Sequence, residues 1–184
     1  MGFVFVSGDL ALDLVGTLKW RRSDPEELLA TPADLARWSV EAGVLSEEPP
    51  VDAAGLRRTV ALREVVYRLA RHAMDGRPWP EDDLHELNRA AEGPAPRTTL
   101  TPSGMIRVGD VTAVAAEVAR TAIALLAGLD RSRIRECGHP DCTRIFIDRS
   151  RAGNRQWCGM EECGNRVKAA NYRSRKSRAV TADR

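Results

Sequence analysis

The sequence has no long hydrophobic run, few aromatic residues, and no cysteine before position 137. No apolar run approaches the roughly 18–20 residues that a membrane-spanning helix requires. Residues 1–16 contain no basic region and no A-x-A cleavage site, so they do not have the pattern of a secretory signal peptide. We therefore expect a cytoplasmic protein, in a compartment where disulfides are rare.

Several common catalytic motifs are also missing. The sequence has no H-E-x-x-H, no glycine-rich phosphate loop followed by Lys and Ser or Thr, and no G-x-S-x-G. The acidic residues Glu81, Asp82 and Asp83 fall at an expected helix start, where the helix dipole favours carboxylates. Asp13 lies in an apolar stretch and is the one acid that indicates a ligand pocket, although a capping or hydrogen-bonded structural role is the simpler explanation. We predict that the protein is not an enzyme.

The charge is divided unevenly along the chain. Residues 1–130 contain 14 Lys+Arg and 20 Asp+Glu, a balance of −6, whereas residues 131–184 contain 14 and 6, a balance of +8. A basic C-terminal region indicates an anionic partner, and a basic tail that only aids solubility accounts for the composition equally well. The split predicts two domains, residues 1–130 and residues 131–184.

Hydrophobic periodicity predicts a mainly α fold for the first domain. We expect a short strand at residues 3–6 that leads into a helix ending near residue 18, and a helical turn at residues 24–29. Thr31 is an expected N-cap, with Pro32 at the first helical position and Asp34 three residues on. Further helices are expected at residues 52–75, 80–92 and 110–127, the last being central to the core, with a small β-hairpin at residues 98–108.

The four cysteines form two C-x4-C pairs separated by fifteen residues: Cys137, Cys142, Cys158 and Cys163. Two close pairs around a short loop suit tetrahedral zinc, because each pair can chelate from a tight turn. Two disulfides, an iron–sulfur cluster and four unconnected buried thiols are the weaker alternatives. His139 could replace one thiol as a ligand, but with four thiols present a turn position is the simpler interpretation.

The rest of the C-terminal region is expected to fold around the metal. Residues 145–147, IFI, predict a strand that packs with Trp157 into a small core beside the metal. A basic helix is expected from about Cys158 onward. It has few apolar residues, so metal binding would have to organise it. Loss of one thiol is therefore expected to unfold residues 137–170 without necessarily unfolding the helical domain.

The C-terminal region resembles the CGNR zinc finger, a module named for the tetrapeptide found here as Cys163-Gly164-Asn165-Arg166. The other residues that carry the resemblance are Cys137, Cys142, Phe146, Asp148, Arg155, Trp157, Cys158, Met160 and Lys168. The segments LALDLVGT and TPADLARWSVEAGVL are similar to the ABATE domain that accompanies this finger. The resemblance implies a treble-clef-like zinc finger that binds DNA, a helical domain that senses a ligand, and a role as a bacterial stress-induced transcription regulator. Gly16 stands where the family's usual L-D-x-x-N-T pattern has Asn.

The basic region supplies candidate contacts to nucleic acid. Arg and Asn can recognise base edges, so Asn165 and Arg166 are candidates for base contact. Because both follow directly after an expected ligand cysteine, a structural role is the stronger interpretation. The candidates for phosphate contact are Arg151, Arg155, Arg166, Lys168, Arg173, Arg175, Lys176 and Arg178. A zinc-stapled module that binds a protein or forms a homodimer is the competing hypothesis. RNA binding is less favoured, because the finger has few aromatic residues for stacking.

Overall fold

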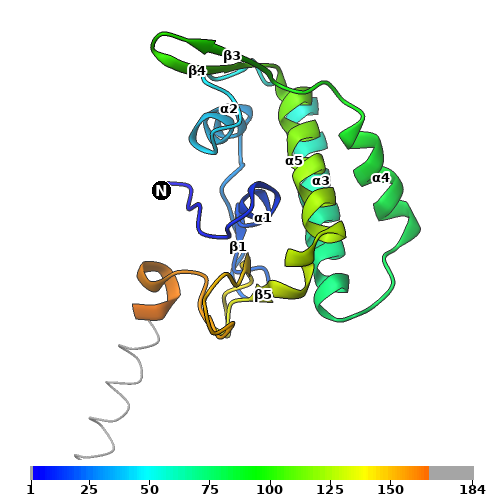
Figure 1. Cartoon of the computed structure of the whole chain (residues 1–184), viewed down its shortest axis with the longest axis vertical. Coiled ribbons are helices and arrows are strands. Elements are labelled where there is room, and N and C mark those ends of the chain that lie inside the picture. The colour runs from blue at the N-terminus through cyan, green and yellow to red at the C-terminus, as the bar shows by residue number, and fades with distance from the viewer. Residues whose placement is uncertain (1, 166–184) are drawn as a thin grey trace, which may run out of the picture.

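The structure, a computed structural model, describes residues 2–165. Its largest part is a bundle of three helices, each of which packs against the other two: α3 (Ala53–Met74), α4 (Glu81–Ala91) and α5 (Val111–Ala127) (Figure 1). Two shorter helices pack on this bundle: α1 (Leu10–Val15) contacts α3 and α5, and α2 (Pro32–Glu41) contacts α3. The mainly α prediction is confirmed. No helix in this part of the chain has the length and apolarity needed to cross a membrane.

Local capping signals begin most of these helices where the sequence predicts. Thr31 Oγ1 accepts from the backbone N–H of Asp34 and the Asp34 carboxylate accepts from the backbone N–H of Thr31, which completes a capping box. Asp52 and Asp110 cap α3 and α5 in the same way, each accepting a backbone N–H three residues on. As expected, α5 is central to the core, because eight of its residues are buried.

The strands form three separate antiparallel pairs. The first pair is β1 (Leu18–Lys19) with β2 (Glu26–Glu27), and the second is the predicted hairpin of β3 (Arg97–Thr101) and β4 (Gly104–Val108). After the 3-10 helix η1 (Leu129–Arg133), the third pair joins β5 (Ile134–Glu136) to β6 (Ile145–Ile147), as the IFI run predicts. A short π-helical turn, η2 (Met160–Gly164), follows. The β3–β4 hairpin and the β5–β6 pair lie at opposite ends of the helical bundle (Figure 1).

Two local predictions are wrong. Residues 3–6 form no strand; instead, the carbonyls of Val4 and Val6 accept hydrogen bonds from Arg144 and Arg155 of the C-terminal region. Residues 24–29 form no helical turn, because β2 pairs with β1 and the Glu27 carboxylate forms a two-bond ion pair with the buried Arg63 of α3. In both segments contacts with distant residues override the local pattern.

The core has two parts. The larger one contains the inner faces of the helices together with Ile134, Ile145 and Ile147 from β5 and β6. The smaller one consists of the four cysteines and Phe146, against which Val6, Trp20 and Trp157 pack. The small core expected from residues 145–147 is therefore divided: Phe146 faces the cysteines, while its two neighbours belong to the helical core.

Candidate metal centre

The loop between β5 and β6 holds the first cysteine pair. Cys137 directly follows β5 and its N–H donates to Arg144 O (2.9 Å), which closes the loop. Within it, Cys142 N–H donates to His139 O (3.0 Å). The loop thus forms a knuckle that turns both thiols toward the same side.

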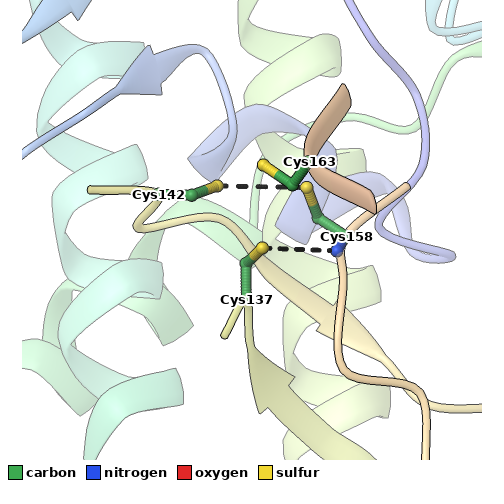
Figure 2. Close-up of side chains that lie close together, drawn as sticks. All are labelled: Cys137, Cys142, Cys158 and Cys163. Carbon is green, nitrogen blue, oxygen red and sulfur yellow. Dashed lines mark hydrogen bonds between the residues drawn. The ribbon is translucent and has the colours of Figure 1, made fainter. Parts of the chain in front are cut away.

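The second cysteine pair lies at the π-helical turn. Cys158 precedes η2, and Cys163 lies within it, with its N–H donating to Gly159 O (3.1 Å). Two hydrogen bonds donated by backbone N–H groups join the two pairs: Gly138 N–H donates to Gln156 O (2.8 Å), and Cys158 N–H donates to Cys137 Sγ (3.5 Å). Figure 2 shows the four sulfurs turned toward a common point.

The four sulfur atoms all lie within 4.8 Å of one another, and each cysteine is at most 7% exposed. Zn–S bonds of about 2.3 Å in a tetrahedron place two sulfurs about 3.8 Å apart. The separation between Cys142 Sγ and Cys158 Sγ is 3.9 Å. All four thiols are free, so the disulfide alternative does not describe this structure. The donor set fits one zinc ion.

Mutual hydrogen bonds separate the acidities of the clustered thiols. Bonds from Cys142 and Cys158 lower the pKa of Cys137 to about 2, because they stabilise its thiolate. The same bonds raise the pKa values of Cys142 and Cys158, since their protons are held by a neighbouring sulfur. Burial raises the pKa of Cys163 to about 12. The cluster of thiols stabilises one thiolate by its own hydrogen bonds. Four thiolates together would require a bound divalent cation.

His139, the alternative ligand, lies outside the cluster. Its Nδ1 accepts from Asp141 N–H (3.3 Å), and its ring meets the edge of Trp20 with centroids 6.0 Å apart. The two tryptophans Trp20 and Trp157, with Val6, cover the cysteines. Trp20 and Val6 come from the helical domain, and the sequence analysis missed both. The metal centre therefore lies at the seam between the two predicted domains.

Arg155 has a structural position. Its guanidinium lies over the Phe146 ring, with Cζ 4.3 Å from the centroid. It donates to four backbone carbonyls: Trp157 O (2.9 Å), Ile147 O (3.4 Å), Val6 O (2.9 Å) and Cys158 O. Through these bonds the guanidinium connects the backbone on either side of Cys158 to β6 and to Val6, and so supports the metal centre. In this conformation it does not face outward toward a phosphate.

The C-terminal region holds residues 4–8, which we call the N-terminal strap. Four of the strap's carbonyls accept hydrogen bonds from this region: Val4 O from Arg144 (3.3 Å), Val6 O from Arg155 (2.9 Å), Ser7 O from Ile147 N–H (2.8 Å) and Gly8 O from Arg149 (2.9 Å). The strap thus joins the two domains through main-chain atoms that no side-chain pattern reveals.

Asp13, the predicted ligand contact, takes part in this seam. Its carboxylate accepts from Ser7 N–H (3.0 Å). Burial raises the pKa of Asp13, while the hydrogen bond from Ser7 N–H and the charge of Arg144 oppose the shift. Gly16, one turn on, borders a cavity of about 10 Å³ together with Arg144 and three of the cysteines. A Cβ at position 16 would lie 3.6 Å from Arg144 Nε, so the family's Asn at this position would reach the seam. A ligand contact at Asp13 stays a prediction.

The remaining predicted contacts divide into two groups. Arg151 is exposed in the loop after β6, and Asn165 is exposed at the end of η2, where its backbone N–H donates to Met160 O. The others lie outside the described residues: Arg166, Lys168, Arg173, Arg175, Lys176 and Arg178. Only Arg151 and Asn165 of the predicted nucleic-acid contacts are placed on the surface of the described chain.

A mainly helical domain is joined here to a four-cysteine centre of the zinc-finger type. The ABATE family model, described as "Putative stress-induced transcription regulator", matches residues 8–129, and the CGNR zinc finger model matches residues 133–176. The chain belongs to the ABATE family and carries a CGNR zinc finger, as the motifs predict. The zinc finger match favours Zn²⁺ over an iron–sulfur cluster. No curated protein matches the chain.

Proposed function

We propose that the protein is a cytoplasmic DNA-binding transcription regulator whose zinc ion is held by Cys137, Cys142, Cys158 and Cys163. The observation that carries the proposal is the closed four-thiol site within the basic part of the chain. Four protein ligands leave zinc no open position for water, which is the property of a structural rather than a catalytic site. The ion with four thiolates carries a charge of −2, so the +8 balance of residues 131–184 still leaves about +6 for an anionic partner.

The proposed contacts to phosphate follow from exposure. Arg151 lies in the loop after β6. The Asp148 carboxylate holds this loop, because it accepts hydrogen bonds from Ser150 N–H (2.9 Å) and Arg155 N–H (3.0 Å) on either side of Arg151. The remaining proposed contacts to the DNA backbone come from basic residues outside the described part of the chain: Arg166, Lys168, Arg173, Arg175, Lys176 and Arg178. Arg155 is left out of the proposed set, because its guanidinium braces the metal centre.

Titration of labelled duplex DNA with the zinc-loaded full chain, followed by fluorescence anisotropy at several salt concentrations, tests the proposal. We expect affinity to fall steeply with salt. Arg151→Ala should reduce the slope of log K against log salt by about 0.9, because one phosphate then keeps its counterion. Arg89→Ala is the matched control, since Arg89 is also an exposed arginine but lies on α4. It should leave the slope unchanged.

Loss of the metal centre separates the competing hypotheses. Cys163→Ser should abolish DNA binding while the helical content largely remains. If the folded, zinc-containing protein fails to bind duplex DNA even at low salt, the DNA proposal is wrong and the zinc-stapled protein-interaction module takes its place. An equal effect of Arg89→Ala and Arg151→Ala would show that only net charge matters.

A further inference from the structure

The β3–β4 hairpin lies at the end of the helical bundle opposite β5 (Figure 1), and it exposes large apolar side chains. Leu100 is 85% exposed and Met105, its partner across the hairpin, is 61% exposed. Val108 and Ile106 are 50% and 38% exposed. By the alternation of strands, Leu100 and Met105 lie on one face of the hairpin, and Ile106 and Val108 lie on the other. Single exposed apolar residues are common on protein surfaces, but neighbouring exposed pairs on one two-stranded arm indicate an interaction.

The two edges of this hairpin differ. On the β4 side, Ser46 N–H donates to Arg107 O (2.9 Å) and Arg107 N–H donates to Ser46 Oγ (2.9 Å), so this edge is covered. Within residues 2–165, the sheet has two strands only, and no segment pairs with the outer edge of β3. β3 is therefore an open edge strand.

Open edge strands are commonly protected by charges, proline or a bulge. Residues 98–101, TTLT, have no charge and no proline, and three of the four are β-branched threonines. Such a strand is a good template for another strand, so its exposure favours a partner that adds to the sheet.

The hydrogen-bonding groups of this edge match a second copy of the same strand. Arg107 directs its N–H and C=O away from β3, toward Ser46. Its cross-strand partner Thr98 must direct its own groups outward as well, and Leu100, two residues on, does the same. In an antiparallel pairing of two β3 strands centred on Thr99, Thr98 of one copy faces Leu100 of the other. Each of these two pairs can exchange two backbone hydrogen bonds.

The charges and apolar side chains fit the same arrangement. Centred on Thr99, the pairing places Arg97 opposite Thr101 of the other copy, so the two Arg97 guanidinium groups are kept apart at opposite ends. Thr98, Leu100, Met105 and Arg107 share one face of the hairpin by the alternation of strands. The Leu100 and Met105 side chains of both copies then form one continuous apolar strip on a four-stranded sheet.

We propose that the protein forms a two-fold homodimer through antiparallel pairing of the β3 edges, centred on Thr99. The interface lies at the end of the helical bundle opposite the β5–β6 pair. It does not depend on whether the finger binds DNA.

Sedimentation equilibrium or light scattering of the zinc-loaded full chain over a concentration series measures the oligomeric state. Thr98→Pro removes the outward N–H of Thr98 in both copies and leaves the β3–β4 ladder intact, because proline is tolerated where a strand's N–H faces outward. We expect the dimer dissociation constant to rise about tenfold or more, because two hydrogen bonds per dimer are removed. Thr98→Val keeps the N–H and is the control, with an unchanged dissociation constant.

Cross-linking tests the register. Thr99→Cys places two thiols on the two-fold axis, where facing residues lie within disulfide range, so mild oxidation should give a covalent dimer. Thr101→Cys, two residues away on the same strand, should remain monomeric on denaturing gels. A monomeric wild-type protein at about 100 μM, a dimer that Thr98→Pro leaves unchanged, or cross-linking at 101 instead of 99 would each overturn the proposal. Circular dichroism and zinc content confirm that each variant is folded.

Discussion

The β3–β4 hairpin and the β5–β6 pair are both short antiparallel pairs, yet their surroundings are opposite. β3 has five residues, four of which are exposed, whereas all three residues of β6 are buried. The β3–β4 hairpin is stabilised by its own ladder and turn. The β5–β6 pair is stabilised by the two cores that pack against the two faces of β6. An isolated pair of three-residue strands has little stability of its own. The comparison shows that packing, not strand length, fixes the β5–β6 pair.

Of the changes considered, metal removal should have the largest effect on stability, because it acts on the β5–β6 pair and leaves the β3–β4 hairpin untouched. Zinc contributes about 10–16 kcal/mol of apparent binding free energy in small zinc-finger peptides, and here it would hold one face of β6. Because Ile134, Ile145 and Ile147 belong to the helical core, we expect chelation to lower the melting temperature of the helical domain as well. The sequence-based expectation was that residues 137–170 would unfold without necessarily unfolding the helical domain, and the shared core adds an effect on that domain.

Thermal unfolding followed by far-UV circular dichroism, with and without a chelator, measures that effect. Zinc release followed with a colorimetric chelator shows that metal has left. Arg151→Ala serves as the control, since it is exposed in the same region and should keep both the metal and the melting temperature. An unchanged melting temperature for the helices after complete zinc release would mean that the two cores are independent.

Truncation of one apolar side chain in each pair sharpens the comparison. Phe146→Ala removes a fully buried ring from the metal core, and we expect it to lower the free energy of unfolding by about 3–5 kcal/mol. Leu100→Ala on the exposed hairpin should change the free energy of unfolding of the monomer by no more than about 0.5 kcal/mol. Urea unfolding at low protein concentration compares the two variants. Equal losses would contradict the distinction between packed and exposed strands.

Arg155 allows a finer test. Arg155→Ala removes a guanidinium that donates to four carbonyls, so we expect a loss of about 2–3 kcal/mol in the free energy of unfolding. Arg155→Lys should restore little of it, because an ammonium cannot reproduce the planar fork. Urea unfolding of both variants, with Arg151→Ala as the exposed control, measures the loss. Full rescue by lysine would show that charge alone is required.

The sequence predicted the features that depend on near neighbours. The capping box of Thr31 and Asp34 spans three residues, and the cysteine spacing indicates a knuckle without knowledge of the fold. The strand at 145–147 was also predicted, but not its position between two cores. The absence of any polar residue in IFI was the available signal, since a strand without alternation is buried on both faces.

The features that the sequence analysis missed depend on distant partners. Arg155 meets Val6 across 149 positions, and Glu27 meets Arg63 across 36. Backbone carbonyls leave no trace in the residue types, so the binding of the strap could not be predicted. For the same reason, the bonds of Arg155 to four backbone carbonyls could not be predicted from its place in a basic region.

The strap also has a consequence for protein synthesis. Its residues, 4–8, leave the ribosome long before Arg144, Ile147, Arg149 and Arg155, which bind its carbonyls. Helices α1 to α5 can associate during translation, but the strap cannot reach its final position until residue 155 has been made. Closure of the seam, with the strap and the knuckle joining together, is therefore a late step that follows the folding of the helices.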